Sequence, residues 1–179
     1  SYVTSGQAMS VAWDDASLKT FLSRATELGP DHPVVISRYV ENSKEIEIDA
    51  VANKGEILVY AISEHIENAG VHSGDATVVL PAQRIYLATA QAIKKAARKI
   101  AAALEITGPF NIQFLAKSAN IQVIECNLRA SRSMPFCSKV FKIDMIDMAT
   151  RAQLAAEVKK VDGSQIDFDY VGVRAAQFS

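Results

Sequence analysis

Two β-strand patterns, residues 110–117 and 121–126, are separated only by Ser118-Ala119-Asn120 and predict an antiparallel hairpin. With this three-residue connection, counting back along the ladder places Gln113 opposite Glu125. Directly opposed residues point to the same face of a sheet, so we expect the amide and the carboxylate to lie side by side. A two-residue turn would instead put them on opposite faces, and the prediction depends on that parity.

The same count places Asn111 opposite Asn127, which adds two more amides to this face. Cβ atoms of such neighbours lie about 5 Å apart. Side-chain oxygens of Gln113, Glu125 and Asn127 can therefore meet at one ion, and oxygen ligands suit Mg²⁺ or Mn²⁺ rather than zinc. The alternative is an ordinary solvated polar face. The other face of the hairpin is predicted to be core and carries Phe110, Ile112, Phe114, Ile124 and Cys126.

Two arginines, Arg129 and Arg132, follow these strands directly. A guanidinium group binds phosphate through paired hydrogen bonds, and a metal ion can bridge the oxygens of the same phosphate chain. Arginines beside a carboxylate that can bind metal therefore point to a phosphate-chain ligand. Surface salt bridges are the alternative for both residues.

The rest of the chain alternates helical and hairpin patterns, which predicts an α+β fold with a largely antiparallel sheet and packed helices. A polar stretch, residues 63–80, breaks all periodicity and is expected to be a long functional loop. The expected helices are residues 14–28, a long helix from Pro81 to Ala103, and 144–157; the other expected strands are 34–40, 45–51 and 57–62.

The long helix has one apolar face, for which we expect Ile85, Ala88, Ala92, Ala96, Ile100 and Ala103. Its basic residues are expected to be a solvated face rather than a nucleic-acid site: Lys94, Lys95, Arg98 and Lys99.

Three acidic residues, Glu45, Glu47 and Asp49, alternate along one strand and can include a ligand for a ribose or a cation. For at least two of them an exposed strand face is the favoured interpretation. His65 and His72 fall in the expected loop, where they suggest positioning or proton transfer near a small anion, or simple solvation. Near the N-terminus, Ser5-Gly6 either covers phosphates with backbone N–H groups or forms a turn.

Composition limits the classes of function. The chain has 179 residues, with 19 basic and 20 acidic side chains and a net charge of -1, so no overall basic field points to nucleic acid. No apolar run reaches the ~18 residues that span a bilayer, and no targeting signal is visible. Cys126 and Cys137 are expected to be reduced thiols in a cytosol-like compartment. Because the first residue is Ser1, we expect a piece of a longer protein.

Beyond these patterns, the sequence Glu125-Cys126-Asn127-Leu128-Arg129 resembles the late-strand signature of the ATP-grasp ligases. Longer stretches resemble the second, carbamate-phosphorylating half of the carbamoyl phosphate synthetase large subunit. They are the run from Glu64 to Asp75, the run from Asn127 to Ser133, and Pro135-Phe136-Cys137-Ser138-Lys139. Leu128 and the Arg-Ala-Ser-Arg-Ser run look like the eukaryotic branch of that family.

The resemblance implies a role for each matching position. Metal ligands are implied at Gln113, Glu125 and Asn127, and contacts with the transferred phosphoryl group and the small anion at Arg129 and Arg132. The implied nucleotide contacts are Ser5 and Gly6 over the phosphates, Ser37, Tyr39 and Val40 at the adenine, Glu45 at the ribose, and His65, Gly70, Val71, His72, Ser73 and Gly74 in the loop, with Gln113 and Glu125 shared.

The family also implies an activity and a context. The expected reaction is phosphorylation of carbamate by ATP with Mg²⁺ or Mn²⁺, two ions per ATP site, in pyrimidine or arginine biosynthesis. Expected partners are ATP, carbamate, the other ATP-grasp half and a glutaminase or ammonia source, in the cytoplasm or the mitochondrion, without nucleic acid or membrane. The isolated chain is expected to be inactive. Alternatives are another ATP-grasp ligase such as biotin carboxylase, or a non-catalytic nucleotide-binding module.

The domain boundaries implied by the family are a small lid subdomain over residues 1–43, a large C-terminal subdomain over 44–160, and a tail over 161–179 that leads to the next domain.

Overall fold

The computed structural model describes residues 10–28, 34–71, 74–161 and 168–176, and the chain divides into two compact units, Ser1–Glu41 and Asn42–Ser179. The first unit contains helix α1 (Asp15–Leu28), close to the predicted range. Asp14 precedes it, and the Asp14 carboxylate accepts a hydrogen bond of 2.7 Å from the backbone N–H of Ser17. This bond satisfies one of the free N–H groups of the first turn and sets where the helix begins.

The predicted strand over residues 34–40 is wrong. These residues form no strand, and Val35 is 89% exposed. A β-branched run favours extended backbone, but a strand also needs a hydrogen-bonded neighbour. Strand pairing within the described residues begins only at Lys44.

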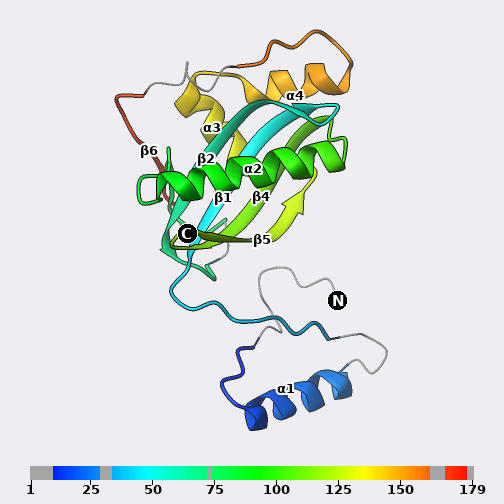
Figure 1. Ribbon diagram of the computed structural model, residues 1–179, viewed down its shortest axis with the longest axis vertical. Helices are drawn as coiled ribbons and strands as arrows, with labels where there is room; N and C mark the ends of the chain where they lie inside the picture. The colour runs from blue at the N-terminus through cyan, green and yellow to red at the C-terminus, as the bar shows by residue number, and fades with distance from the viewer. Residues whose placement is uncertain (1–9, 29–33, 72–73, 162–167, 177–179) are drawn as a thin grey trace. The chain divides into compact units, whose positions relative to one another are not determined.

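The second unit is built on one antiparallel sheet of six strands in the order β5-β4-β1-β2-β3-β6 (Figure 1). Its strands are β1 (Lys44–Asn53), β2 (Glu56–Asn68), β3 (Val78–Leu80), β4 (Gly108–Lys117), β5 (Asn120–Asn127) and β6 (Gly172–Arg174). The β1–β2 and β4–β5 pairs are the two predicted hairpins, and the predicted α+β class is confirmed.

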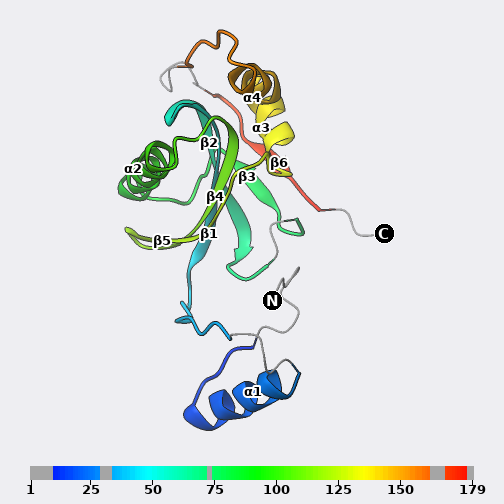
Figure 2. The same ribbon diagram turned by 90° about the vertical axis from the view of Figure 1, so that its right-hand side faces the viewer.

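Helices cover both faces of the sheet (Figure 2): α2 (Leu87–Ala103) lies on one face, and α3 (Met134–Phe141) and α4 (Met145–Gln153) lie toward the other. Even-numbered β1 side chains such as Ile46 and Ile48 pack with α2 in one core. Val51 and Val59 pack with α3 and α4 in a second core. The central strand β1 is therefore buried on both faces. No described helix is long and apolar enough to cross a bilayer.

The expected loop over residues 63–80 is much shorter than predicted. Strand β2 continues to Asn68, and Val78 already begins β3, which pairs with β2 through His65 and Glu64. Charged residues on both faces of the end of β2 hide the period-2 pattern that would mark a strand. His65 therefore lies in a strand, not in a loop.

Helix α2 begins at Leu87, six residues after the predicted start at Pro81. The intervening backbone is held differently: the N–H groups of Gln83 and Arg84 donate to Glu64 Oε1 at 2.9 and 3.0 Å. The fully buried face of the helix is also rotated by one residue from the prediction and consists of Thr89, Ile93, Ala97 and Ala101. The predicted Ala92, Ala96 and Ile100 lie at its margin, partly exposed, whereas Ala88 and Ala103 are exposed.

The predicted C-terminal helix is present as α4, where the Asp144 side chain accepts hydrogen bonds from the N–H groups of Ile146 and Asp147. Helix α3 and strand β6 are additions that the sequence patterns did not indicate. Strand β6 comes from the region expected to be a tail, yet it pairs with β3 at the sheet edge. The domain boundaries themselves stay a prediction.

Candidate nucleotide and metal site

Gln113 lies directly opposite Glu125 in the β4–β5 ladder, but the connection is not the predicted one. Lys117 pairs with Asn120, so the turn has two residues rather than three. A register shift between Gln113 and Phe114 adds one residue, Ile124, to strand β5 and corrects the parity. The bulge thus keeps Gln113 and Glu125 on the same face of the sheet, as the predicted third turn residue was expected to do.

The bulge also makes one predicted core residue wrong. Ile124 is the unpaired residue of the bulge on the edge strand β5 and is 47% exposed, whereas Ile112 and Phe114 are buried as predicted. Cys126 pairs with Ile112 and packs at the margin of the α2 core.

The predicted metal ligands form a compact oxygen-rich group at this end of the hairpin. Gln113 is half-buried, Glu125 is exposed, and Asn127 Nδ2 donates to Glu125 Oε1 at 2.8 Å. This bond leaves the Asn127 amide oxygen and the second Glu125 oxygen as acceptors, which is the donor set that Mg²⁺ or Mn²⁺ takes. Among the described residues no group of three or more His, Cys, Asp or Glu side chains is placed to hold a metal, so a cation here would depend on the amides.

The two arginines follow this group on exposed chain. Arg129 Nη1 donates to the Ala130 carbonyl at 3.2 Å, and Arg132 is exposed immediately before Ser133. No described carboxylate lies within salt-bridge distance of either guanidinium, so the salt-bridge alternative has no support within the described residues.

The acidic residues of β1 are buried, which contradicts the favoured interpretation of an exposed strand face. Glu45, Glu47 and Asp49 have exposed fractions of 6%, 1% and 0%. They lie on the α3 side of the sheet, where Glu47 pairs with Gln113 and Asp49 pairs with Asn111. We refer to Glu45, Glu47, Asp49, His65, Asn111 and Ser133 as the buried polar cluster.

His65 joins two of these acids. His65 Nε2 lies 3.2 Å from Glu47 Oε1, and His65 Nδ1 lies 3.7 Å from Glu45 Oε1. Burial disfavours the charged imidazolium, but the hydrogen bond and charge of Glu47 and the charge of Glu45 outweigh it and raise the pKa of His65. Burial also raises the pKa of Glu45, whereas the hydrogen bonds of its neighbours overcome burial and lower the pKa of Glu47.

Asn111 links Glu47 to the third carboxylate of β1, Asp49. Its Nδ2 donates to Glu47 Oε2 and to Asp49 Oδ1, each at 3.1 Å. Burial first, and then the charge of Glu47, raise the pKa of Asp49 to about 7. Burial likewise raises the pKa of the Cys137 thiol, which donates to Asp49 Oδ2 at 3.7 Å.

Several predicted nucleotide contacts gather at this face. The Gly70 backbone hydrogen-bonds the Glu45 carboxylate, which places the end of β2 next to Glu45 and His65. Glu125 is close enough for its charge to act on Glu45. The neighbouring loop residue Val71 is exposed, at 36%.

Other predicted contacts belong to the first unit or fall outside the described residues. Ser37 and Tyr39 are exposed, Val40 is partly exposed, and the Tyr39 ring packs edge-on against Trp13 at 5.7 Å between centroids. Ser5, Gly6, His72 and Ser73 lie outside the described residues, and Gly74 is partly exposed.

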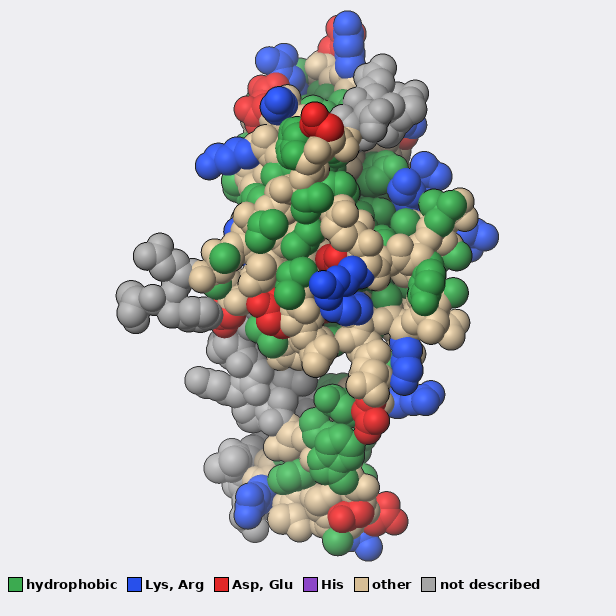
Figure 3. Space-filling model, turned by 90° about the vertical axis from the view of Figure 1, so that its left-hand side faces the viewer, with side chains coloured by type: hydrophobic (Ala, Val, Ile, Leu, Met, Phe, Trp, Pro, Cys, Tyr) green, Lys and Arg blue, Asp and Glu red, His purple; other side chains and the backbone are tan. Residues whose placement is uncertain are grey.

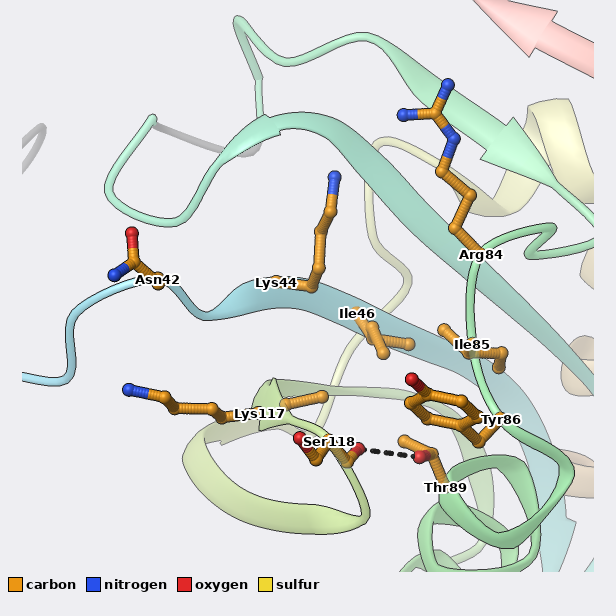
Figure 4. A pocket seen from close by; sticks show the side chains of 10 residues that line it. Asn42, Lys44, Ile46, Arg84, Ile85, Tyr86, Thr89, Lys117 and Ser118 are labelled. Carbon is orange, nitrogen blue, oxygen red and sulfur yellow. Dashed lines mark hydrogen bonds between the residues drawn. The ribbon is translucent and has the colours of Figure 1, made fainter.

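A pocket of about 170 Å³ lies on the other face of the sheet (Figure 4). Ile46 and Ala116, which belong to the α2 core, form part of its wall, and the Tyr86 ring stands at its mouth beside Thr89. It does not contain the group at Gln113, because that residue points to the opposite face.

On the face drawn in Figure 3, the described Lys and Arg side chains lie among acidic and apolar ones and form no single basic patch.

The sequence matches the family described as "Carbamoyl-phosphate synthase L chain, ATP binding domain" over residues 1–161. The chain belongs to this family. The predicted resemblance is therefore confirmed, and with it the ATP-binding character of the domain.

The sequences of several relatives align with this chain over its full length. The multifunctional protein pyr-3 of Neurospora crassa is 53% identical over 179 residues, which is 100% of this chain and 10% of that protein. The mitochondrial carbamoyl-phosphate synthase [ammonia] of Homo sapiens is 48% identical over 184 residues, 12% of its length. The chain thus spans about a tenth of these relatives.

Solved structures of carboxylases share the fold of this carbamoyl-phosphate synthase domain. A pyruvate carboxylase variant from Rhizobium etli has a TM-score of 0.75 and 17% identity, covering 96% of this chain and 16% of that one. A biotin carboxylase complex with β,γ-ATP from Campylobacter jejuni has a TM-score of 0.75 and 16% identity, covering 96% and 39%. The predicted ATP-grasp fold is confirmed, while biotin carboxylase is only a distant structural neighbour.

Sequence reasoning missed two residues that complete the cluster of this domain. Ser133 donates to Glu47 Oε1 at 3.1 Å, and Arg174 Nη1 donates to Ser133 Oγ at 3.3 Å. Ser133 stood within a quoted motif but no role was assigned to it, and Arg174 lies on the unpredicted strand β6. No local signal links either residue to β1.

Proposed function

We propose that the chain supplies the ATP- and metal-binding part of a carbamoyl-phosphate synthase that phosphorylates carbamate. The observation that carries the proposal is the alignment of Gln113, Glu125 and Asn127 on one sheet face, followed at once by two exposed arginines. Membership of the ATP-binding family supports it.

The amide and carboxylate oxygens of these residues fit Mg²⁺ or Mn²⁺, and Gln113, Glu125 and Asn127 would hold it. A bound divalent ion, or a pair of them, offsets negative charge on the phosphate oxygens of ATP. Glu125 brings the one formal charge of this set, because the other two donors are neutral amides.

The remaining work of the chain is binding and orientation. Arg129 and Arg132 bind the oxygens of the transferred phosphoryl group and hold carbamate, since guanidinium groups bind such oxygens in pairs. The Glu45 carboxylate accepts hydrogen bonds from the ribose hydroxyls. Gly70, Val71 and His65 are proposed as further nucleotide contacts. Adenine contacts are proposed at Ser37, Tyr39 and Val40, and phosphate contacts at Ser5, Gly6, His72 and Ser73.

Phosphoryl transfer then needs little covalent chemistry from the protein. The carbamate oxygen attacks the γ-phosphorus in line, the bond from phosphorus to the β,γ-bridging oxygen breaks, and ADP leaves. Positioning and charge stabilisation carry the rate. Exclusion of water protects carbamate from side reactions.

The proposal extends to the surroundings of the chain. We place residues 1–43 in a small lid subdomain and 44–160 in the large subdomain of the ATP-grasp fold, with 161–179 leading onward. The partners are ATP, carbamate, the other ATP-grasp half and a glutaminase or ammonia source. A cytoplasmic protein of pyrimidine synthesis is favoured over a mitochondrial one because several relatives at 53–54% identity are multifunctional pyr proteins.

The experiment uses the full-length synthase that contains the chain and follows the reverse reaction, ATP formation from ADP and carbamoyl phosphate. Glu125→Ala and Arg132→Ala are expected to lower kcat at least about 100-fold, whereas Glu157→Ala, an exposed control, keeps it. Magnesium-dependent nucleotide binding without any transfer in the unmodified protein would favour a non-catalytic module. Biotin-dependent rather than carbamate-dependent ADP formation would favour a carboxylase.

A further inference from the structure

Ser133 occupies the N-cap position of α3 but does not cap that helix with its side chain. Its hydroxyl instead donates to Glu47 Oε1 at 3.1 Å and accepts from Arg174 Nη1 at 3.3 Å. The side chain of Ser133 is 3% exposed, so this bond replaces a local cap with a contact to a distant strand.

Ser131 fills the capping role that Ser133 gives up. Its Oγ accepts hydrogen bonds of 3.0 Å from the backbone N–H groups of both Ser133 and Met134, and its side chain also hydrogen-bonds Asp49. The serines on either side of Arg132 are therefore both attached to buried acids of β1.

Glu47 is itself fixed from three directions. It is 1% exposed, and its two oxygens accept from Ser133, His65 and Asn111 at 3.1 to 3.2 Å. Asn111 lies two residues from Gln113 on β4, and Glu47 pairs directly with Gln113. Three hydrogen bonds to a carboxylate this deeply buried restrict its orientation.

We infer that Glu47 is a positioning residue that acts through Ser133. It fixes the segment carrying Arg129 and Arg132 relative to the strands carrying Gln113 and Glu125. The inference rests on the proposed function, because it depends on the roles proposed there for Arg129 and Arg132. It assigns Glu47 itself no contact with substrate or metal. Arg132 is exposed, but its neighbours Ser131 and Ser133 are hydrogen-bonded to buried acids of β1, and these bonds fix the position of the segment.

The expected size of the effect follows from geometry. A misplacement of about 1 Å at a reacting centre costs up to about 100-fold in rate. Without the Ser133 hydroxyl, Glu47 keeps its hydrogen bonds to His65 and Asn111, so we expect the fold to be retained. The arginine segment loses one attachment to β1, the bond from Ser133 to Glu47. Ground-state nucleotide binding depends on other residues and should change little.

The test compares Ser133→Ala with Ser138→Ala in the full-length synthase. Ser138 is a matched control on the same helix: it is half-buried, donates to the Met134 carbonyl at 3.0 Å and accepts from Met145 N–H at 3.2 Å. For ATP formation from ADP and carbamoyl phosphate, Ser133→Ala should lower kcat about 10- to 100-fold, with the KM for ADP within about twofold. Ser138→Ala should leave kcat and KM within about twofold of the wild type. It should lower the melting temperature by about as much as Ser133→Ala does, because each variant loses side-chain hydrogen bonds.

Glu47→Gln is expected to reproduce the loss of kcat, and Arg132→Lys tests whether Ser133 acts through the arginine segment. If Ser133 acts through the arginine segment, Ser133→Ala should cost much less in the Arg132→Lys background than alone. Equal kcat for the two serine variants, or an undiminished loss in that background, would overturn the inference. If the Arg132→Lys variant and the Arg132→Ala variant each kept full activity, the role of Arg132 in the proposed function would instead be overturned.

Discussion

Gln113 and Glu125 face each other across the β4–β5 ladder because one extra residue, Ile124, compensates for a turn that is one residue shorter than expected. Side chains alternate along a strand, so a change of one residue moves every later side chain to the opposite face. The bulge therefore determines which face receives the carboxylate. Bulges are common beside functional sites because they redirect a side chain in this way.

Ile124 should contribute little to stability despite its apolar side chain. It is 47% exposed, whereas Ile112 in the adjacent strand is fully buried. We expect Ile124→Ala to lower the free energy of unfolding by less than about 1 kcal/mol and Ile112→Ala by about 2–5 kcal/mol. Urea denaturation of the chain measures both, and equal losses would mean that Ile124 is packed in the core.

The hairpins were predictable because their signals are local. Period-2 alternation over residues 45–51 and short polar turns define neighbouring antiparallel strands without reference to the rest of the chain. The pairing of Gln113 with Glu125 was also predicted, but through a wrong turn length. No sequence pattern distinguishes a three-residue turn from a two-residue turn with a bulge here.

The buried polar cluster was not predictable because its cover is distant in sequence. Alternation shows that Glu45, Glu47 and Asp49 share a face, but not that α3 lies over that face. Glu47 and Ser133 are separated by 86 positions. An acidic strand face is normally solvated, and only the unpredicted helix α3 reverses that expectation.

Glu125 should control the magnesium dependence of nucleotide binding in the full-length synthase. Glu125→Gln keeps the size of the side chain but removes the one formal charge among the three proposed ligands. We expect ATP affinity in Mg²⁺ to fall at least about tenfold and the difference between Mg²⁺ and EDTA to disappear. Titration calorimetry measures this, with Glu157→Gln as an exposed control; a retained Mg²⁺ effect would exclude Glu125 as a ligand.

Glu64 should determine where α2 begins. Its Oε1 accepts from the N–H groups of Gln83 and Arg84, and its side chain is 1% exposed. Glu64→Ala orphans both groups and should cost at least about 2 kcal/mol, whereas Glu64→Gln keeps the acceptor and should cost about 1 kcal/mol or less. Urea denaturation gives the energies, and hydrogen exchange of the two amides should accelerate only in the alanine variant. Equal protection in both variants would contradict this role.

Asp49 should make the stability of the chain fall as pH rises from about 4 to about 7. Burial and the charge of Glu47 raise the pKa of Asp49 from 3.8 to about 7, so the folded state keeps a proton that the unfolded state has lost. A folded state that binds more protons loses stability with increasing pH, by up to about 1.4 kcal/mol per pH unit for one group. Asp49→Asn removes this contribution, so the free energy of unfolding of the wild type minus that of the variant should fall across the same range.

The measurement is the free energy of unfolding in urea at several pH values for both proteins. Glu56→Gln is a control of opposite sign, because the hydrogen bond and charge of Lys160 lower the pKa of exposed Glu56. The contribution of Glu56 is lost as pH falls rather than as it rises. If the free energy of unfolding of the wild type minus that of Asp49→Asn stays flat or rises from about pH 4 to about pH 7, folding does not raise the pKa of Asp49.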